Sequence, residues 1–141
     1  MKARFHKLHA NAVAPTKANL GDVAWDFTSI EGGAIEPGRR KVFKTGIQLE
    51  LPEGYGLILK ERSGMSVKHG LRVLAGVIDN GYRGELLVCL LNTDDKRHFI
   101  EVGDRICQGY IQKIENIEWE ESDSELSQTD RGNGGFGSSG K

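Results

Sequence analysis

The sequence predicts an all-β fold, a jelly-roll-like β-barrel or sandwich with one short helix and a flexible glycine-rich C-terminal tail. Apolar residues before Glu115 alternate with polar ones or form short blocks, and they almost never recur at helical spacing. Glycine and proline separate these blocks at short intervals, a pattern typical of barrels and sandwiches. The chain has 141 residues, which is enough for one compact core.

Seven strands are predicted from these blocks. The clusters Glu31–Gly33, Pro37–Gly38 and Pro52–Gly54 are typical of turns, and residues 92–97 form a polar connection. Strands separated in this way can pair with their neighbours in antiparallel sheets. The predicted strands are Arg4–Leu8, Val23–Thr28, Arg40–Thr45, Ile47–Leu51, Gly56–Lys60, Gly84–Asn92 and Arg105–Ile114.

One short helix is predicted between the fifth and sixth of these strands. It begins at Arg62-Ser63-Gly64 and continues to about His69, with Ser63 as its N-cap and Gly70 as the residue that ends it. Free backbone amides at a helix start attract anions. Ser63 and Arg62 are therefore candidates for phosphate binding, although a plain cap and a solvated charge would also explain them.

A tight turn carries the most informative residues of the chain. In the stretch GVIDNGYRGE, Asn80-Gly81 is the dipeptide best able to supply the positive φ angles of a two-residue hairpin turn. Asp79 and Tyr82 are thereby predicted to lie at a hairpin. A carboxylate held on rigid strand ends can act as a general base, so Asp79 is the candidate catalytic residue.

The C-terminal part differs in composition from the rest. An acidic segment continues to Glu125, and Ser, Thr, Asn and Gly dominate after it, so residues 1–121 are predicted to form the β domain and residues 122–141 a flexible tail. Arg131 and Phe136 lie among glycines in that tail. This combination suits a flap that closes on an anion and a ring, whereas an ordinary flexible terminus would need no function.

Charge and cysteine content exclude several classes of protein. The net charge is -1, from 19 basic and 20 acidic side chains, so generic binding to nucleic acid or to anionic membrane is disfavoured. Cys89 and Cys107 lie in apolar runs without metal-ligand spacing and are predicted to be buried free thiols. No stretch has the pattern of a signal peptide or a membrane helix. We therefore expect a cytoplasmic protein, in the host cytoplasm if the chain is viral.

Five segments, read in order, closely resemble the five motifs of the trimeric dUTP pyrophosphatases, the dUTPases. The segments are VAWDFTS from Val23, RSGMSVKHG from Arg62, GVIDNGYRGE from Gly76, GDRICQGYI from Gly103 and RGNGGFGSSG from Arg131. The resemblance implies Mg²⁺-dependent hydrolysis of dUTP to dUMP and pyrophosphate. That reaction keeps uracil out of DNA and supplies dUMP for thymidylate synthesis. It also implies a homotrimer whose active sites are shared between subunits.

The resemblance further assigns roles by position. Asp79 would activate a water for in-line attack on the α-phosphorus, and Tyr82 would lie against the deoxyribose and exclude a 2′-hydroxyl. Asp26 would orient water around a Mg²⁺ ion held chiefly by the triphosphate, so its contribution to the metal site is indirect. The other substrate-binding residues implied are Arg62, Ser63, Gly64 and Gln108 near the phosphates, Val73, Gly76, Val77 and Ile78 near uracil, and Arg131, Gly135, Phe136, Gly137 and Ser138 in the tail.

Two other functions remain open from the sequence. A dCTP deaminase, or a bifunctional deaminase with pyrophosphatase activity, shares the superfamily fold and needs an additional catalytic Glu, for which Glu85 is available. A nucleotide-binding module that regulates an unknown protein partner is the second.

We also expect Asp104 and Arg105 to pair with each other for the local fold, and His6, His9 and His98 to be surface residues.

Overall fold

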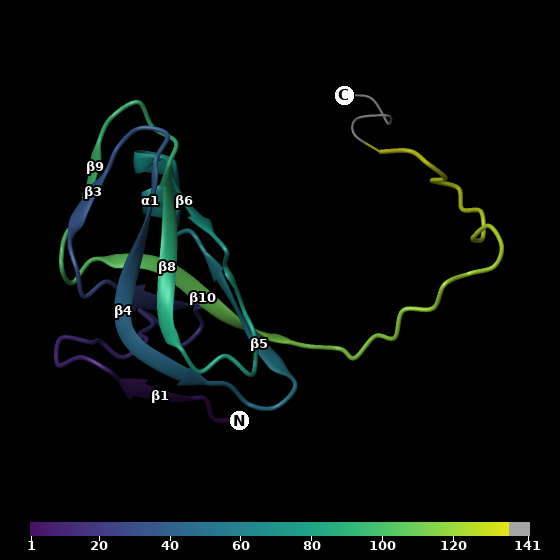
Figure 1. Ribbon diagram of the computed structural model, residues 1–141, viewed down its shortest axis with the longest axis horizontal. Coiled ribbons are helices and arrows are strands. Elements are labelled where there is room, and N and C mark those ends of the chain that lie inside the picture. Colours follow the sequence, from purple (N-terminus) through teal and green to yellow (C-terminus); the bar gives the residue numbers. More distant parts are fainter. Residues whose placement is uncertain (136–141) are drawn as a thin grey trace.

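The computed structural model describes residues 1–135, and they form two four-stranded antiparallel sheets and a smaller one (Figure 1). The first sheet has the order β1 (Arg4–Lys7), β4 (Arg40–Glu50), β8 (Glu85–Asn92) and β6 (Leu71–Leu74). The second has the order β2 (Trp25–Thr28), β10 (Arg105–Lys113), β5 (Tyr55–Lys60) and β7 (Val77–Ile78). The third pairs β3 (Gly33–Ile35) with β9 (His98–Ile100). The mostly β fold predicted from the sequence is confirmed.

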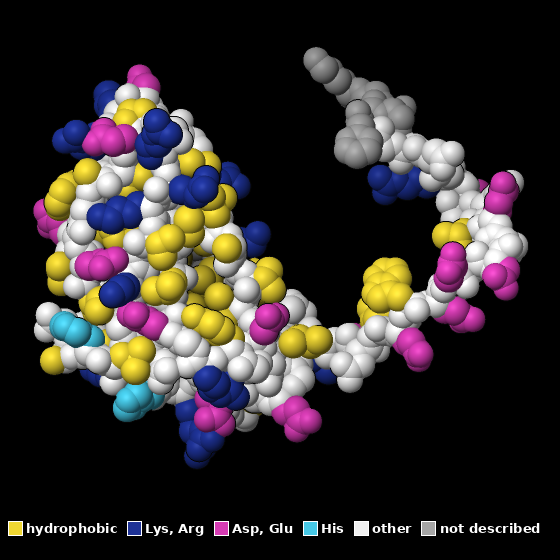
Figure 2. All heavy atoms as spheres, viewed as in Figure 1, with side chains coloured by type: hydrophobic (Ala, Val, Ile, Leu, Met, Phe, Trp, Pro, Cys, Tyr) yellow, Lys and Arg dark blue, Asp and Glu magenta, His cyan; other side chains and the backbone are white. Residues whose placement is uncertain are grey.

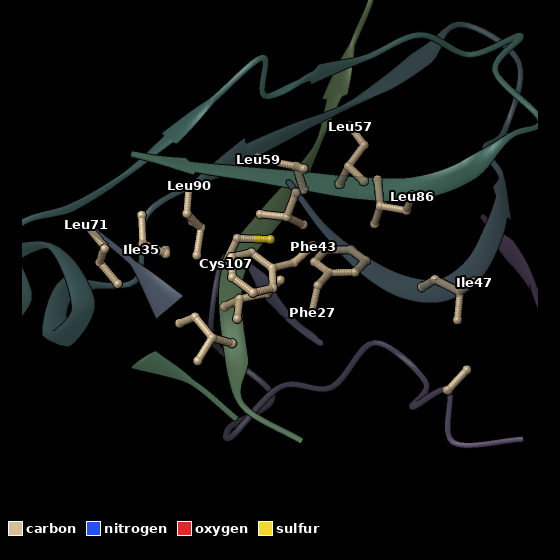
Figure 3. Close-up of a cluster of buried hydrophobic side chains, with 14 of the residues drawn as sticks. Phe27, Ile35, Phe43, Ile47, Leu57, Leu59, Leu71, Leu86, Leu90 and Cys107 are labelled. Atoms are coloured by element: carbon tan, nitrogen blue, oxygen red, sulfur yellow. The ribbon is translucent and has the colours of Figure 1, made fainter. Parts of the chain in front are cut away.

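The hydrophobic core lies between the two larger sheets, with the small sheet closing one side. Alternation along β8 sends Leu86, Val88 and Leu90 inward, while Leu87 between them is 42% exposed. Figure 3 shows Leu86 and Leu90 among the buried side chains of the opposite sheet. The buried cluster includes Phe43, Ile47, Leu71, Leu86, Val88 and Leu90 from the first sheet, Phe27, Leu57, Leu59, Ile106 and Cys107 from the second, and Ile35 and Ile100 from the third.

The predicted strands match the observed ones to within two residues at each end, with one exception. The blocks Arg40–Thr45 and Ile47–Leu51 form a single strand, β4, whose pairing with β8 shifts register between Lys44 and Gln48. The shift coincides with Gly46, whose φ of 70° bends the strand without ending it. The Gly46 N–H freed by this bulge donates to Glu85 Oε1 at 2.8 Å.

Four short strands were not predicted. β3 begins at Gly33, in the segment expected to be a turn, because the chain here pairs with β9 across a separation of many residues. β6 and β7 follow each other closely in sequence but join different sheets, with β6 beside β8 and β7 beside β5. Strands of two to four residues have too few positions for their alternation to be recognised.

The helix α1 (Ser63–His69) is confirmed, but its predicted N-cap is wrong. Arg62 holds the N-cap position, with φ −76° and ψ 140°, and its side chain makes no capping hydrogen bond. Arg62 instead directs its guanidinium to the Asp26 carboxylate, and Ser63 already has helical geometry. Gly70 ends the helix as predicted, because its φ of 59° is a left-handed conformation that glycine adopts without strain.

Beyond β10 the chain leaves the sheets. Residues 114–133 are all exposed, and Figure 1 shows this segment curving away from the sandwich. In the part of the chain up to residue 135, no helix has the length and apolar character to cross a membrane.

Two histidines near α1, His69 and His98, make the stability of the fold depend on pH. The rings of His69 and His98 are 4.7 Å apart, and His98 is half-buried rather than at the surface as expected. Burial, and then the nearby His69, lower the pKa of His98, while Asp104 and Asp94 partly oppose the shift. The native state therefore favours neutral His98.

Acidification should consequently destabilise the fold through His98. The contribution of neutral His98 is fully present above the ordinary pKa of histidine and is lost as the pH falls through the lowered value. Between about pH 7 and pH 5, the free energy of unfolding should therefore fall less in His98→Gln than in the wild type. We expect the difference to be less than about 1 kcal/mol, because solvent screens the charge. Urea unfolding at both pH values measures this effect. An unchanged pH dependence would contradict it, and exposed His6→Gln is the control.

Candidate active site

Asp79 begins a four-residue turn where the chain passes from one sheet to the other. The Tyr82 N–H donates to the Asp79 carbonyl at 3.1 Å, which closes the turn. The predicted hairpin is wrong, because β7 and β8 on either side of the turn belong to different sheets. Neither Asn80 nor Gly81 has a positive φ. Because β7 and β8 do not pair with each other, the chain does not need a two-residue hairpin turn whose twist matches that of paired strands.

Side-chain hydrogen bonds hold this turn in place. The Asn80 side-chain amide donates to the carbonyls of Pro52 at 2.6 Å and Tyr55 at 2.8 Å, both next to the start of β5. The Arg83 guanidinium donates to the Asn80 carbonyl at 2.6 Å. These bonds fix the backbone directly after Asp79, as the positioning of a general base requires.

Asp79 and Tyr82 line one shallow apolar hollow of about 310 Å³. Asp79 is exposed, and Tyr82 is 43% exposed. An apolar hollow with one acid and one phenol suits a ligand that presents a flat ring to the wall and a polar group to the acid. The other lining residues come from β4, β6, β7 and β8 and the segment between β6 and β7: Val42, Leu74, Ala75, Val77, Ile78, Leu87 and Cys89.

Two predicted residues lie beside this hollow rather than on its wall. Val73 packs against the core, and its N–H donates to Glu61 Oε1 at 3.3 Å. The Gly76 carbonyl accepts from the Leu59 N–H at 2.7 Å, which ties the segment between β6 and β7 to β5. Val77 and Ile78 line the hollow as predicted.

A second hollow, of about 650 Å³, collects cationic side chains. Lys60, Arg62 and Arg105 line it together with the predicted Ser63, Gly64 and Gln108. Asp26, whose side chain is 15% exposed, accepts from Arg62 Nε at 2.8 Å and from Arg105 Nη1 at 2.9 Å. Planar guanidiniums held by a carboxylate on one side present their remaining N–H groups to a phosphate chain.

Arg105 was assigned to the local fold from the sequence, and its predicted pairing with Asp104 is wrong. Asp104 Oδ2 accepts from the Glu101 N–H at 2.8 Å instead. The pairing of β10 with β2 shifts register between Arg105 and Cys107. In a regular strand, Arg105 and Gln108 would lie on opposite faces of the sheet. The irregularity brings both side chains to the same hollow. Nothing in the sequence marks the shift.

Both cysteines are free, but they differ in environment. Cys107 is buried as predicted, and burial, with a smaller effect of Asp26, raises the pKa of its thiol to about 12. It is therefore not available as a nucleophile. Cys89 is only half-buried and lies on the wall of the hollow that contains Asp79.

Most of the predicted tail residues lie away from both hollows or outside the described residues. Arg131 is exposed on the segment that leaves the sandwich, and its Nε donates to the Gly134 carbonyl at 3.0 Å. Figure 2 shows the last described residues of this segment separated from the body of the molecule. Gly135 is half-buried, and Phe136, Gly137 and Ser138 lie outside the described residues.

Comparison with known proteins decides the family. The family model described as dUTPase matches residues 10–140, nearly the whole chain. The chain belongs to the dUTPase family. A curated dUTPase relative, the deoxyuridine 5′-triphosphate nucleotidohydrolase of Wolinella succinogenes, is 43% identical, covering 100% of this chain and 95% of its own length.

Solved dUTPase structures agree with this assignment. A variant of the dUTPase of Staphylococcus bacteriophage 80alpha, with dUpNHpp, has a TM-score of 0.91 and 30% identity, covering 99% of both chains. A variant of the dUTPase of phage phi11 of S. aureus, which coordinates a structural Mg(II) ion, has a TM-score of 0.83 and 26% identity. It covers 90% of this chain and 100% of its own. The family resemblance predicted from the five motifs is confirmed.

Proposed function

We propose that this chain hydrolyses dUTP to dUMP and pyrophosphate, with Asp79 as the general base. The observation that carries the proposal is the position of Asp79 on a turn fixed by Asn80 and Arg83, on the wall of the hollow that Tyr82 shares. Membership of the dUTPase family and the similarity to a structure with dUpNHpp support the substrate.

In this reaction, Asp79 takes a proton from a water whose oxygen attacks the α-phosphorus. The new P–O bond forms as the bond from the α-phosphorus to the oxygen bridging to the β-phosphorus breaks, and pyrophosphate leaves with that oxygen. Uracil and the deoxyribose occupy the apolar hollow, where Val77 and Ile78 contact the base and Tyr82 covers the sugar. The Gly76 carbonyl, bonded to the Leu59 N–H, sets the position of that wall.

The phosphate chain lies against the cationic hollow. Arg62 donates from a guanidinium already oriented by Asp26, and the backbone at Ser63 and Gly64 approaches closely because neither side chain is large. Gln108 lines the same hollow from β10 and donates to a phosphate oxygen. Arg105 adds a second oriented guanidinium that the sequence did not suggest.

Mg²⁺ is the proposed cofactor, and the residues present fit an indirect site. Within residues 1–135, no three His, Cys, Asp or Glu side chains are grouped to hold a metal ion. Each Asp26 oxygen accepts one guanidinium bond and retains a lone pair for a water. Asp26 would therefore hold metal-bound water rather than the ion. Bound to the triphosphate, Mg²⁺ neutralises charge on the phosphate oxygens.

A homotrimer with shared active sites follows as part of the proposal. The base hollow and the phosphate hollow of one chain have no lining residue in common, and we propose that different copies supply them to one site. The tail, with Arg131, Gly135, Phe136, Gly137 and Ser138, would close over a site from a further copy. Exposed apolar side chains such as Phe5 and Phe99 suit burial between subunits. We place the enzyme in the cytoplasm.

The deaminase alternative is weaker because of where Glu85 lies. Its carboxylate accepts the Gly46 N–H at the β4 bulge and does not line the hollow that contains Asp79. A regulatory role with a protein partner would be compatible with hydrolysis, and no contact of the described residues favours it.

The deciding experiment measures pyrophosphate release from dUTP, UTP, dCTP and dTTP with Mg²⁺, together with ammonia release from dCTP. We expect rapid release from dUTP alone and no ammonia. Ammonia from dCTP would establish the deaminase instead, and no hydrolysis of dUTP would refute the proposal.

Sugar selectivity provides a separate prediction at Gly84. The Tyr82 ring lies directly against this glycine, and a methyl group there would come within 2.6 Å of Tyr82 Cζ. Because the Tyr82 O–H also donates to the Glu85 carbonyl at 2.9 Å, the ring cannot shift without losing that bond. Gly84→Ala should therefore displace Tyr82 and reduce the preference for dUTP over UTP.

We expect the ratio of kcat/KM for dUTP to that for UTP to fall about tenfold in Gly84→Ala, the effect of about 1.4 kcal/mol of lost discrimination. Gly81→Ala is the matched control, because a methyl group at Gly81 has no atom within 4 Å. Equal ratios in the two variants would contradict the role of Gly84.

A further inference from the structure

Glu61 occupies the junction between β5, which ends at Lys60, and α1, which begins at Ser63. It directly precedes the segment Arg62–Gly64 on the wall of the cationic hollow, yet it does not line that hollow itself. α1 packs against β6, as Figure 1 also shows. The junction is therefore the place where the phosphate-side segment meets the strand that leads to the base hollow.

The Glu61 carboxylate makes a bond that connects this junction to β6. Glu61 Oε1 accepts from the Val73 N–H at 3.3 Å and from Arg72 Nε at 2.9 Å. β6 is the edge strand of its sheet, so a backbone N–H on its outer side has no neighbouring strand to accept it, and the Val73 N–H bonds to Glu61 instead. The Glu61 side chain is 18% exposed, whereas that of Arg72 is 57% exposed. Of the two bonds that Glu61 Oε1 accepts, the one from the Val73 N–H is therefore the more buried, and the one from Arg72 is the more exposed.

The backbone of Glu61 is held from the other side by β10. Its carbonyl accepts from Gln108 Nε2 at 2.8 Å. Burial by itself raises the pKa of the Glu61 carboxyl, but hydrogen bonds from its own N–H and that of Val73, together with Arg72 and Lys60, outweigh burial and lower it. The side chain is therefore charged at neutral pH, and its bond to the Val73 N–H is charge-assisted.

We propose that Glu61 is a positioning residue that fixes the phosphate-binding segment Arg62–Gly64 relative to β6 and β10. The proposal rests on the proposed function, since it requires that Arg62–Gly64 contact the phosphate chain. Without the carboxylate, the junction keeps the bond from Gln108 but loses its attachment to Val73. Arg62 and the start of α1 can then move away from the β- and γ-phosphates, while the base hollow keeps its own wall residues.

The test compares two ligands by calorimetry: dUMP, which lacks the outer phosphates, and the dUTP analogue dUpNHpp. In Glu61→Ala, we expect affinity for dUpNHpp to fall about tenfold, the effect of losing one hydrogen bond to a charged group. Affinity for dUMP should stay unchanged within about twofold. A merely structural role would lower the unfolding temperature and weaken both ligands alike.

Matched variants separate the backbone bond from the ion pair. Arg72→Ala removes only the exposed partner and should leave both affinities unchanged. Glu61→Gln keeps an acceptor for the Val73 N–H and should restore most of the affinity for dUpNHpp. If Glu61→Ala does not fold, Glu61→Asp, too short to reach Val73, replaces it with the same expectation.

The outcomes distinguish this proposal from the proposed function. Wild-type protein that neither binds dUpNHpp nor hydrolyses dUTP refutes the function. Wild-type activity with equal losses for dUMP and dUpNHpp, with no loss for either, or with Arg72→Ala as damaging as Glu61→Ala, overturns the role of Glu61 alone.

Discussion

Asp79→Asn should lower kcat for dUTP hydrolysis by about 10²- to 10⁴-fold, the range in which a general base contributes. Asparagine has the same size but cannot accept the proton of the attacking water. The turn itself should persist, because its bonds come from Asn80, Arg83 and the Tyr82 backbone rather than from the Asp79 carboxylate. Single-turnover kinetics with dUTP and Mg²⁺ measure the effect on chemistry apart from binding.

Binding of dUpNHpp checks the same substitution. We expect the dissociation constant of Asp79→Asn to stay within about threefold of wild type, since the apolar wall and the cationic hollow are intact. Asp123→Asn, an exposed acid on the C-terminal segment, is the control and should be fully active. Wild-type turnover in Asp79→Asn would disprove the assignment, and an equal loss of affinity and turnover would point to a structural role.

Long strands could be predicted from the sequence because alternation is visible over enough residues. β8 is the best case, with Leu86, Val88 and Leu90 inward and Leu87 outward. The short strands β3, β7 and β9 could not be predicted, since they are fixed by partners distant in sequence. Gly46 was interpreted as the gap between two strands, although a bulge accommodates it inside one.

The candidate site shows the same division between local and long-range information. Asp79 and Tyr82 could be found from a motif of ten residues, and the structure brings them to one hollow. The turn type was wrong because Asn80-Gly81 is a local hairpin signal, whereas the flanking strands join different sheets. Arg105 was missed because its position depends on a register shift in β10, and Glu61 because its partner Val73 follows the helix.

Removal of residues 131–141 should lower kcat/KM for dUTP by about 10²-fold or more, because closure of the tail would supply both water exclusion and alignment of the phosphates. Stability should not change. Residues 112–133 are exposed, and the buried core is complete by Cys107. We therefore expect the truncated protein to keep the unfolding temperature of the full chain, and light scattering should give the same number of subunits.

Substitution of Arg131 distinguishes specific phosphate binding by this side chain from shielding of the site by the tail as a whole. Arg131→Lys keeps the charge but loses the planar fork that binds two phosphate oxygens together. We expect it to recover only part of the activity lost on truncation, with the deficit mainly in kcat if the clamp acts as the transition state forms. Full activity in Arg131→Lys would mean that charge alone suffices. Normal hydrolysis by the truncated chain would remove the tail from the mechanism and leave Arg62 and Arg105 as the guanidiniums that bind the phosphates.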